Sequence, residues 1–262
     1  MEPIVPKLLL IPTDFSAPSA QALRYGAALA ERFSAHLLVI YADPFVLPVD
    51  LTLSAGAVFD MARIDMVDAA REQLEAFVET NVPRSVPYDI RVLVGTPVDA
   101  ILAQASEVGA GLIVMGTHGR TGLHRLLVGS VAGAIMRLAP VPVIVVHDES
   151  PLESAAMRRI ASAPQSTHEA AVAVSVAHRF GGDNAEYLEV PEGADLAEIA
   201  RAGAADLIVL GIVARHGMAD SLRGTAAERV VQHTICPALT VNRFAAARVA
   251  GVIHDFEPVL AG

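Results

Sequence analysis

Gly111-Leu-Ile-Val-Met-Gly-Thr-His-Gly119, followed after nine residues by Gly129-Ser130, is the stretch that decides the fold. Its apolar first part, 111–115, predicts a short strand that is buried on both faces. Gly116 and Gly119 allow the backbone after this strand to turn close to a ligand. Gly129-Ser130 opens a helical pattern, with Ser130 as a favourable N-cap, and the first-turn N–H groups of a helix bind anions. The stretch therefore predicts a phosphate-binding site.

Apolar runs alternate with helical patterns on both sides of this stretch. Strands separated by helices imply a parallel sheet with helices on both faces, here an α/β, Rossmann-like, doubly wound sheet of five strands. Such sheets bind ligands at the carboxyl ends of their strands, where Asp14, Tyr41-Ala42 and Gly116 lie. The predicted strands are 7–12, 36–41, 88–94, 111–115 and 141–146, and the predicted helices are 17–33, 60–80, 97–108 and 130–138.

The glycine spacing matches a family signature at every specified position. Gly116, Gly119 and Gly129-Ser130 fit G-x2-G-x9-G-[ST], and the chain thereby resembles the universal stress protein family. The stretch from Leu8 to Ser16 resembles the first strand and acidic turn of that family, and 141–146 resembles its last strand. The resemblance covers 1–147 closely and about 162–243 in degraded form. It implies an adenine-nucleotide alpha-hydrolase-like fold that binds ATP, with Mg²⁺ arriving on the nucleotide phosphates.

The second half of the chain repeats the first with losses. Its signature has Ala214 in place of the middle glycine, and alanine disfavours a positive φ and a close approach to phosphate. The residues before Ser162 lack the apolar run and the aspartate of a first strand, and only 185–190 is strand-like between Phe180 and Gly193. We therefore expect tandem repeats of which the second is truncated, without about one helix and at least one strand, and binds no nucleotide by itself.

These repeats set the expected domain boundaries. A universal stress protein domain with the nucleotide site spans 1–148, a linker 149–161, and a degenerate second domain 162–243. The tail at 244–262 contains a faint echo of the first strand and its turn. It could add an antiparallel edge strand or remain loose, because a parallel return needs a longer crossover than the chain offers there.

Composition excludes several other classes of protein. The chain has 262 residues, of which 53% are hydrophobic, and this is enough for two ordinary domains with substantial cores. No apolar run reaches the length of a membrane span, and the N-terminus does not resemble a signal peptide. The single cysteine, Cys236, suits a reducing compartment, so we expect a cytoplasmic protein in which this thiol is buried rather than catalytic.

Charge and lysine content restrict the partners. The net charge of −10 argues against nucleic acid, because binding to its phosphates needs a basic surface. Lys7 is the only lysine, and no G-x-x-x-x-G-K-[ST] motif occurs, so the chain is not a P-loop nucleotidase. Phosphate contacts must therefore come from backbone amides, hydroxyl groups and arginine, a set that suits binding better than fast phosphoryl transfer.

The family resemblance implies a set of nucleotide-binding residues, and some of them have two interpretations. Asp14 either accepts hydrogen bonds from the ribose or helps to hold a metal, or it caps the first helix through the turn at Ser16. Tyr41 either stacks on the base or packs against the apolar segment 43–59. The implied set is Pro12, Thr13, Asp14, Tyr41, Ala42, Met115, Gly116, His118, Gly119, Arg120, Gly129, Ser130, Val131 and Ala132.

Other candidates carry weaker signals. Arg120 and Arg125 either pair with phosphates or remain solvated loop charges. His118 is expected to act through its backbone. The one candidate zinc site in the sequence combines His118 with His124, and its signal is weak. We therefore assign no resident metal and no catalytic residue. The apolar segment 44–59 forms either a lid, a partner surface or a packing face for the second repeat.

The leading functional hypothesis is an ATP-binding regulatory module of the stress response that acts on an unidentified protein partner. One alternative is a slow ATPase or phosphotransferase with Asp14 at the same site, and another is a scaffold that binds no nucleotide. Family members commonly pair through their final strands. We thus expect the strands at 141–146 and 238–242 to pair within one chain as a pseudo-dimer, or chains to form a homo-oligomer such as a dimer.

Overall fold

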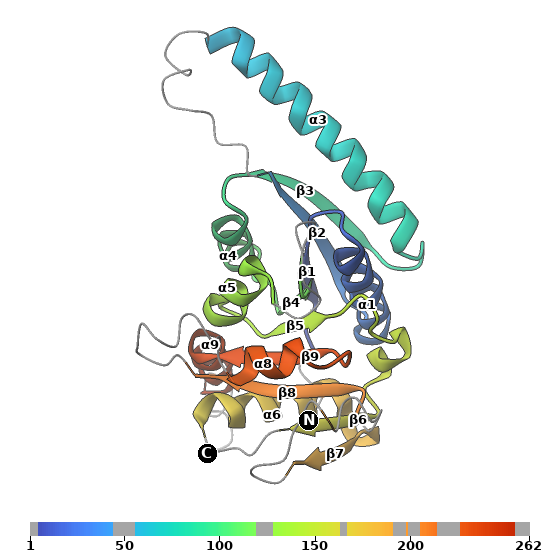
Figure 1. Ribbon diagram of the computed structural model, residues 1–262, viewed down its shortest axis with the longest axis vertical. Helices are drawn as coiled ribbons and strands as arrows, with labels where there is room; N and C mark the ends of the chain where they lie inside the picture. Colours follow the sequence, from blue (N-terminus) through green and yellow to red (C-terminus); the bar gives the residue numbers. More distant parts are fainter. Residues whose placement is uncertain are drawn as a thin grey trace, which may run out of the picture.

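The strands of both repeats join into one sheet in the computed structural model (Figure 1). The structure describes residues 5–43, 56–118, 128–162, 167–190, 198, 205–213 and 226–254. Over these ranges the strand order is β3-β2-β1-β4-β5-β9-β8-β6-β7. All neighbouring strands are parallel except β5 and β9, which are antiparallel. The predicted α/β fold with a five-stranded parallel sheet in the first repeat is therefore confirmed.

The first repeat follows the predicted alternation of strands and helices closely. The helix predicted at 60–80, α3, begins at Gly56 and runs along the β3 edge of the sheet (Figure 1). The elements are β1 (Leu8–Thr13), α1 (Ala17–Phe33), β2 (His36–Asp43), α3 (Gly56–Asn81), β3 (Tyr88–Val94), α4 (Pro97–Glu107), β4 (Leu112–Gly116), α5 (Ser130–Leu138) and β5 (Val143–Val146).

Two apolar layers cover the two faces of the sheet. Because side chains of a strand alternate between its faces, Leu9 and Ile11 face one layer and Leu10 faces the other. The first layer packs under α1 and α3 of the first repeat and α6 and α9 of the second, and the other layer packs under α4, α5 and α8. Among the described helices, none is long and apolar enough to cross a membrane.

The second repeat keeps the central part of the fold. Its strand order β9-β8-β6-β7 matches β5-β4-β1-β2 of the first repeat. Residues 190–206, between β7 and β8, are too few for the helix, strand and helix that occupy 44–111 of the first repeat. The second repeat is thus truncated as predicted. Its elements are β6 (Arg159–Ser162), α6 (His168–Gly181), β7 (Glu186–Glu189), β8 (Leu207–Ile212), α8 (Ala226–Gln232), β9 (Ala238–Asn242) and α9 (Arg243–His254), with short 3-10 helices η1 (Leu152–Ala156) and η2 (Gly182–Asn184).

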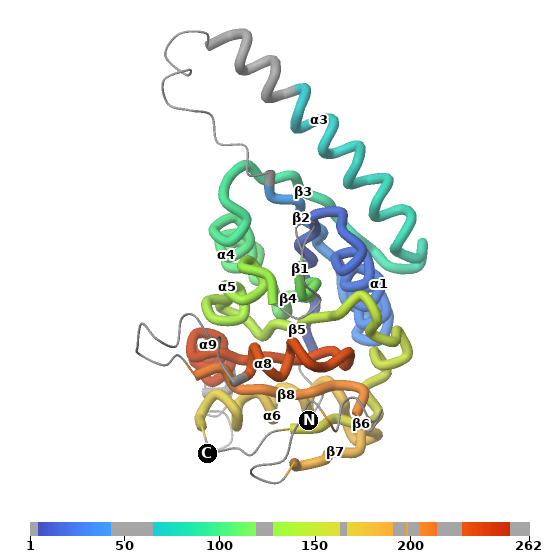
Figure 2. The backbone as a smooth tube through the Cα atoms, in the orientation of Figure 1, coloured from blue at the N-terminus to red at the C-terminus, as the bar shows by residue number. Residues whose placement is uncertain are grey.

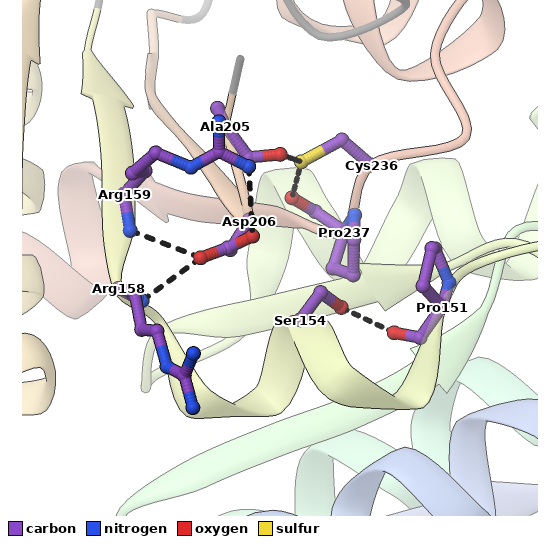
Figure 3. A network of polar contacts seen from close by, with 8 residues as sticks. All are labelled: Pro151, Ser154, Arg158, Arg159, Ala205, Asp206, Cys236 and Pro237. Atoms are coloured by element: carbon purple, nitrogen blue, oxygen red, sulfur yellow. Dashed lines mark hydrogen bonds and ion pairs between the residues drawn. The ribbon is translucent and has the colours of Figure 1, made fainter. Parts of the chain in front are cut away.

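The expected linker at 149–161 is wrong at its end, because Arg159–Ser162 form the first strand of the second repeat, β6. The Asp206 carboxylate accepts hydrogen bonds from the backbone N–H groups of Arg158 and Arg159, both at 3.0 Å (Figure 3). The Arg159 guanidinium lies 3.6 Å from the same carboxylate. This contact with a residue far along the chain supports β6, whose sequence lacks the expected apolar run.

Cys236 is buried beside this network (Figure 3). Its Sγ lies 3.4 Å from the carbonyl oxygen of Ala205. Burial and, secondly, the charge of Asp206 raise the pKa of the Cys236 thiol to about 12. The thiol therefore stays protonated at neutral pH, in agreement with a packing role.

The expectation of an added strand or a loose segment in the C-terminal tail is also wrong for the described part of that tail. Residues Arg243–His254 form the helix α9, and 255–262 lie outside the described residues. The Asn242 side-chain oxygen accepts hydrogen bonds from the N–H groups of Phe244 (2.8 Å) and Ala245 (3.0 Å). This capping starts a helix in an alanine-rich segment, whereas β6 already fills the first-strand position.

The two repeats meet at β5 and β9, where the green half of the backbone joins the orange half (Figure 2). The predicted pairing of the final strands within one chain is therefore observed. Asn242 also donates hydrogen bonds to the carbonyls of Met136 and Ala139 at the end of α5, both at 3.0 Å. In return, Nε2 of His147, just after β5, lies 2.6 Å from the carbonyl oxygen of Val231 in α8. Each final strand thus caps a helix of the other repeat.

A second connection crosses the first apolar layer. The Arg32 guanidinium, at the end of α1, donates to the carbonyls of Phe180 (2.9 Å) and Gly181 (3.0 Å) at the end of α6. It also donates to the carbonyls of Ala155 and Ala156 in η1. The rings of Phe33 and Phe180 pack beside it, with 5.3 Å between their centroids.

Replacing Asn242 with alanine should destabilise the protein strongly. The change removes the cap of α9 and leaves two buried carbonyls of α5 without their donor, so we expect a loss of roughly 2–3 kcal/mol in the free energy of unfolding. Urea denaturation measures this loss. Asn184→Ala, at an exposed position of η2, is the control and should change the free energy by less than about 0.5 kcal/mol. Equal effects of the two substitutions would contradict the capping role.

His147 should make the stability depend on pH. Burial lowers the pKa of His147 below its ordinary value. The unfolded chain therefore binds a proton at His147 more readily than the native chain, so the free energy of unfolding should fall as the pH drops below about 6.5. His147→Gln keeps a donor for the Val231 carbonyl but cannot titrate, and it should show a smaller fall between pH 7 and 5. If both proteins lose stability in parallel over this range, His147 is not the cause.

Candidate functional site

A cavity of about 280 Å³ opens at the carboxyl ends of β1, β2 and β4 in the first repeat. All predicted site residues that lie within the described ranges line this cavity. Gly119 and Arg120, together with His124 and Arg125, lie outside those ranges. The lining residues are Pro12, Thr13, Asp14, Ser19, Tyr41, Ala42, Pro97, Ile101, Met115, Gly116, His118, Gly129, Ser130, Val131 and Ala132.

Three lining residues were not predicted from the sequence: Ser19, Pro97 and Ile101. Pro97 is the first residue of α4, and Ile101 lies one turn further along the same helix. A helix that follows a parallel strand starts at the carboxyl edge of the sheet, so the Thr96-Pro97 helix start was a signal for this wall. Ser19 lines the cavity because its hydroxyl is hydrogen-bonded within the turn after β1.

The turn after β1 is held by its own hydroxyl and carboxyl groups. Thr13 donates to the Ser19 hydroxyl at 3.0 Å, and both side chains are buried. The Asp14 carboxylate accepts from the backbone N–H of Ser16 at 3.1 Å, and Ser16 is the N-cap of α1. Asp14 therefore supports the helix cap through Ser16 and also lines the cavity, so the two interpretations of Asp14 are compatible.

An aromatic cluster supports this turn from outside. Phe15 has a positive φ of 65°, which is uncommon for a residue with a side chain. Its ring packs against Tyr41, with 4.7 Å between centroids, and against Phe77 of α3 at 5.5 Å. Tyr41 is thus a packing partner of Phe15 and a lining residue of the cavity, and the segment 44–55, its other proposed neighbour, lies outside the described residues.

The start of α5 forms the opposite wall. Its N-cap is Gly129 and not Ser130, because the backbone N–H of Gly129 donates to the Thr117 carbonyl at 2.7 Å and fixes the helix start one residue earlier. Ser130 occupies the first helical position with its side chain exposed. No side chain caps this helix, and its first turn contains no acidic residue. The positive end of α5 therefore faces the cavity.

Gly116 is required by packing as well as by its position at the cavity. A Cβ atom built on Gly116 would lie 2.9 Å from the backbone of Pro18 in α1, and the φ of Gly116 is not positive. In the second repeat, a Cβ atom on Gly211 would lie 2.4 Å from the backbone nitrogen of Ala170 in α6. In the first repeat this glycine lets α1 approach β4, and in the second repeat it lets α6 approach β8. This packing is a different reason for a glycine here from the ligand contact inferred from the sequence.

The charge around the cavity is small in the part that the structure describes. Asp14 is the only carboxylate among the described lining residues, and none of them is an arginine or a lysine. Nδ1 of His118 lies 2.9 Å from the Thr117 hydroxyl. No group of three or more His, Cys, Asp or Glu side chains suited to a metal ion occurs within the described ranges.

This geometry defines a class of protein: a tandem, doubly wound α/β protein with a ligand cavity at the carboxyl edge of its first repeat. The model of the universal stress protein family matches the chain twice, at residues 7–147 and 148–242. The chain therefore belongs to the universal stress protein family.

Individual relatives agree with this assignment. The chain is 34% identical over 143 residues to a universal stress protein of Methanocaldococcus jannaschii, a match that covers 53% of this chain and 81% of the relative. It is 33% identical over 141 residues to a universal stress protein of Thermus aquaticus, covering 54% of this chain and 98% of the relative.

Solved structures match over nearly the whole chain. A universal stress protein from Archaeoglobus fulgidus superposes with a TM-score of 0.61 at 17% identity, covering 90% of this chain and 96% of the other. A functionally unknown protein from Pseudomonas aeruginosa superposes with a TM-score of 0.58 at 14% identity, covering 96% and 98%. At these identities the likeness supports the tandem fold alone.

Replacing Gly116 with alanine should destabilise the fold even without ligand. The added methyl group meets the backbone of Pro18, which cannot move aside as a side-chain end would, so we expect a loss of roughly 1–3 kcal/mol. Gly251→Ala is the control, since a Cβ atom there has nothing within 4 Å, and it should be neutral or slightly stabilising. Urea denaturation of the nucleotide-free protein compares them. A Gly116→Ala protein as stable as the unaltered chain would refute the packing argument.

Proposed function

We propose that the first repeat binds one adenine nucleotide, ATP before others, and that the protein is a regulatory binding module of the stress response. The observation that carries this proposal is the uncapped start of α5, which faces the cavity next to Asp14 and a set of apolar walls. Membership of the universal stress protein family supports the same function.

The start of α5 suits the phosphates of a nucleotide. Backbone N–H groups at Ser130, Val131 and Ala132 belong to the first helical turn, where no intrahelical acceptor exists. Together with the exposed Ser130 hydroxyl they provide donors for phosphate oxygens, and the helix dipole favours the negative charge. Mg²⁺ bound to the phosphates would reduce their charge, and Asp14 is the described carboxylate that could approach it.

The remaining walls suit a nucleoside. Ala42, Ile101 and Met115 offer apolar surface for the flat base, and Asp14 can accept hydrogen bonds from ribose hydroxyls. The volume of about 280 Å³ lies just below the roughly 300–1,000 Å³ typical of small-molecule sites. The base and the sugar thus occupy the cavity, and the phosphates lie at its mouth beside α5.

Binding fits these groups better than catalysis does. The described lining residues include no lysine or arginine that could stabilise a transferred phosphoryl group. The Asp14 carboxylate already accepts a hydrogen bond from the backbone N–H of Ser16. In the second repeat, Ala214 replaces the glycine that would approach the phosphates. We therefore propose one nucleotide per chain, with the second repeat as a covalently attached pseudo-dimer partner.

Denaturing the freshly purified protein and identifying the released nucleotide by chromatography and mass tests this function. We expect up to one adenine nucleotide per chain, and nucleotide-free protein should bind added ATP with Mg²⁺ at the same stoichiometry. Two nucleotides per chain would assign a working site to the second repeat. No released nucleotide together with no binding of added ATP would refute the proposal in favour of a scaffold.

Ser130→Asp separates binding from folding. An acidic residue at the first position of α5 favours the helix dipole, so stability should stay level or rise by up to about 0.5 kcal/mol. The same charge repels the phosphates, so the affinity for ATP should fall at least about tenfold. His168→Asp, the exposed first position of α6, is the matched control and should leave ATP binding unchanged. Equal ATP affinity in both variants would place the phosphates elsewhere.

A further inference from the structure

A second cavity, of about 200 Å³, lies between the repeats on the opposite side of the first repeat from the nucleotide cavity. It is formed by the amino-terminal ends of β1, β4 and β5 and by the helices α6 and α9 of the second repeat. Its lining residues are Val5, Pro6, Gly109, Ala110, Gly111, Pro140, Val141, Pro142, Val176, Arg179, Phe180, Arg248 and Val249.

Two arginines supply all the polar side chains of this lining. Arg179 comes from α6 and Arg248 from α9, and every other described lining residue is apolar or glycine. Over the described part of the chain, neither guanidinium has a hydrogen bond or an ion pair, although the whole chain carries an excess of acidic residues. Arg179 is half-buried and Arg248 is exposed. Two like charges that line one apolar cavity, with no carboxylate among its described lining residues, favour an anionic occupant.

The repeat symmetry explains why Arg179 is available. Arg179-Phe180 occupies the position of Arg32-Phe33 in the first repeat. A cation in the last turn of a helix ordinarily bonds the terminal carbonyls of that helix. In α6 the carbonyls of Phe180 and Gly181 already accept from Arg32, which crosses from the first repeat. Arg179 is thereby released from capping and lines the cavity instead.

Arg248 is contributed by an element without a counterpart in the first repeat. The strand β5 is followed by His147 and the segment that leads to η1, whereas β9 continues directly into α9. Asn242 caps α9 and so determines where Arg248 and Val249 lie. The cavity therefore depends on the asymmetry between the two repeats, and a symmetric pair would not form it.

The backbone N–H groups just before β4 are already hydrogen-bonded, so they do not compete with the guanidinium groups for a ligand. The N–H groups of Ala110 and Gly111 donate to the carbonyls of Ala105 and Leu8, both at 3.0 Å. The last turn of α4 is thus internally paired, and recognition of a ligand head group falls to the arginines. Guanidinium groups bind carboxylate and phosphate oxygens in pairs of parallel hydrogen bonds.

We propose that this cavity binds a small organic anion with an apolar body. The oxyanion head, a carboxylate or a phosphate monoester, lies between Arg179 and Arg248. The body packs against Pro6, Val141 and Phe180. The volume accommodates an aromatic or short aliphatic acid. The second site shares no described lining residue with the proposed ATP site and is therefore distinct from it.

Calorimetric titration with four probes tests this site in the full chain saturated with ATP and Mg²⁺. Benzoate and phenyl phosphate combine an oxyanion with an apolar body, benzyl alcohol lacks the charge, and inorganic phosphate lacks the body. We expect saturable binding of at least one of the first two at one site per chain, and at least tenfold weaker binding of the last two. Preference between benzoate and phenyl phosphate identifies the head group.

Substitutions show where the probe binds. Arg179→Gln and Arg248→Gln should each weaken binding about tenfold, since each removes one charged donor, and both proteins should fold because neither side chain makes a hydrogen bond among the described residues. Val249→Trp keeps both charges and fills the cavity, and it should also abolish binding. Arg84→Gln, at an exposed position outside the cavity lining, is the matched control and should bind normally.

Several outcomes would overturn the proposal. The proposal is wrong if no probe binds saturably or if the protein with both Arg179→Gln and Arg248→Gln binds as tightly as the unaltered chain. It is also wrong if inorganic phosphate binds as tightly as the aromatic probes, or if Val249→Trp binds normally. If nucleotide-free protein binds the probe but ATP displaces it, the probe occupies the first cavity and the proposed second site is wrong. Because the titration is also run without ATP, a failure of the proposed nucleotide function leaves this test intact.

Discussion

The antiparallel pairing of β5 with β9 is the constraint on which the rest of the molecule depends. It joins two parallel sheets into one and places α5 and α8 next to each other across the seam, where the Arg137–Glu228 ion pair links them. A free edge strand exposes unpaired backbone groups, and this pairing covers one edge of each repeat, whereas β3 and β7 remain the edges of the joined sheet. The side chains of Asn242 and His147 then cap helices across the seam, so the position of α5, and with it the cavity of the first repeat, depends on contacts from the second repeat.

The glycine signature combines two physical requirements that sequence alone does not separate. Gly129 turns the chain into α5 and brings the helix start beside Thr117, which is a requirement of the site. Gly116 allows α1 to pack against β4, which is a requirement of the fold. The second repeat keeps Gly211, where the same packing applies, and it also keeps Gly224 at the position of Gly129. Of the three signature glycines only the middle one is replaced, by Ala214.

The first repeat could be predicted from its sequence because most of its strands are continuous apolar runs and its helices have regular apolar faces. Every strand of 7–147 lies where its run predicts, and the described site residues converge on one cavity. The errors have different origins. β6 depends on the Asp206 carboxylate, a contact with a distant residue that no local pattern reveals. Asn242 before an alanine-rich segment, in contrast, is a local N-cap signal that predicts α9. The shift of the N-cap from Ser130 to Gly129 depends on the carbonyl of Thr117, just after β4.

Asymmetry between the repeats is the physical basis of the proposed anion site. In a symmetric pair, equivalent arginines at the ends of α1 and α6 would have equivalent partners. Here Arg32 donates hydrogen bonds to the terminal carbonyls of α6, and the second repeat has α9 where the first repeat has a loop. Arg179 is left without a carbonyl to cap, and Arg248 is brought to the same cavity. The proposed nucleotide site lies within the first repeat, whereas the proposed anion site needs two arginines of the second repeat.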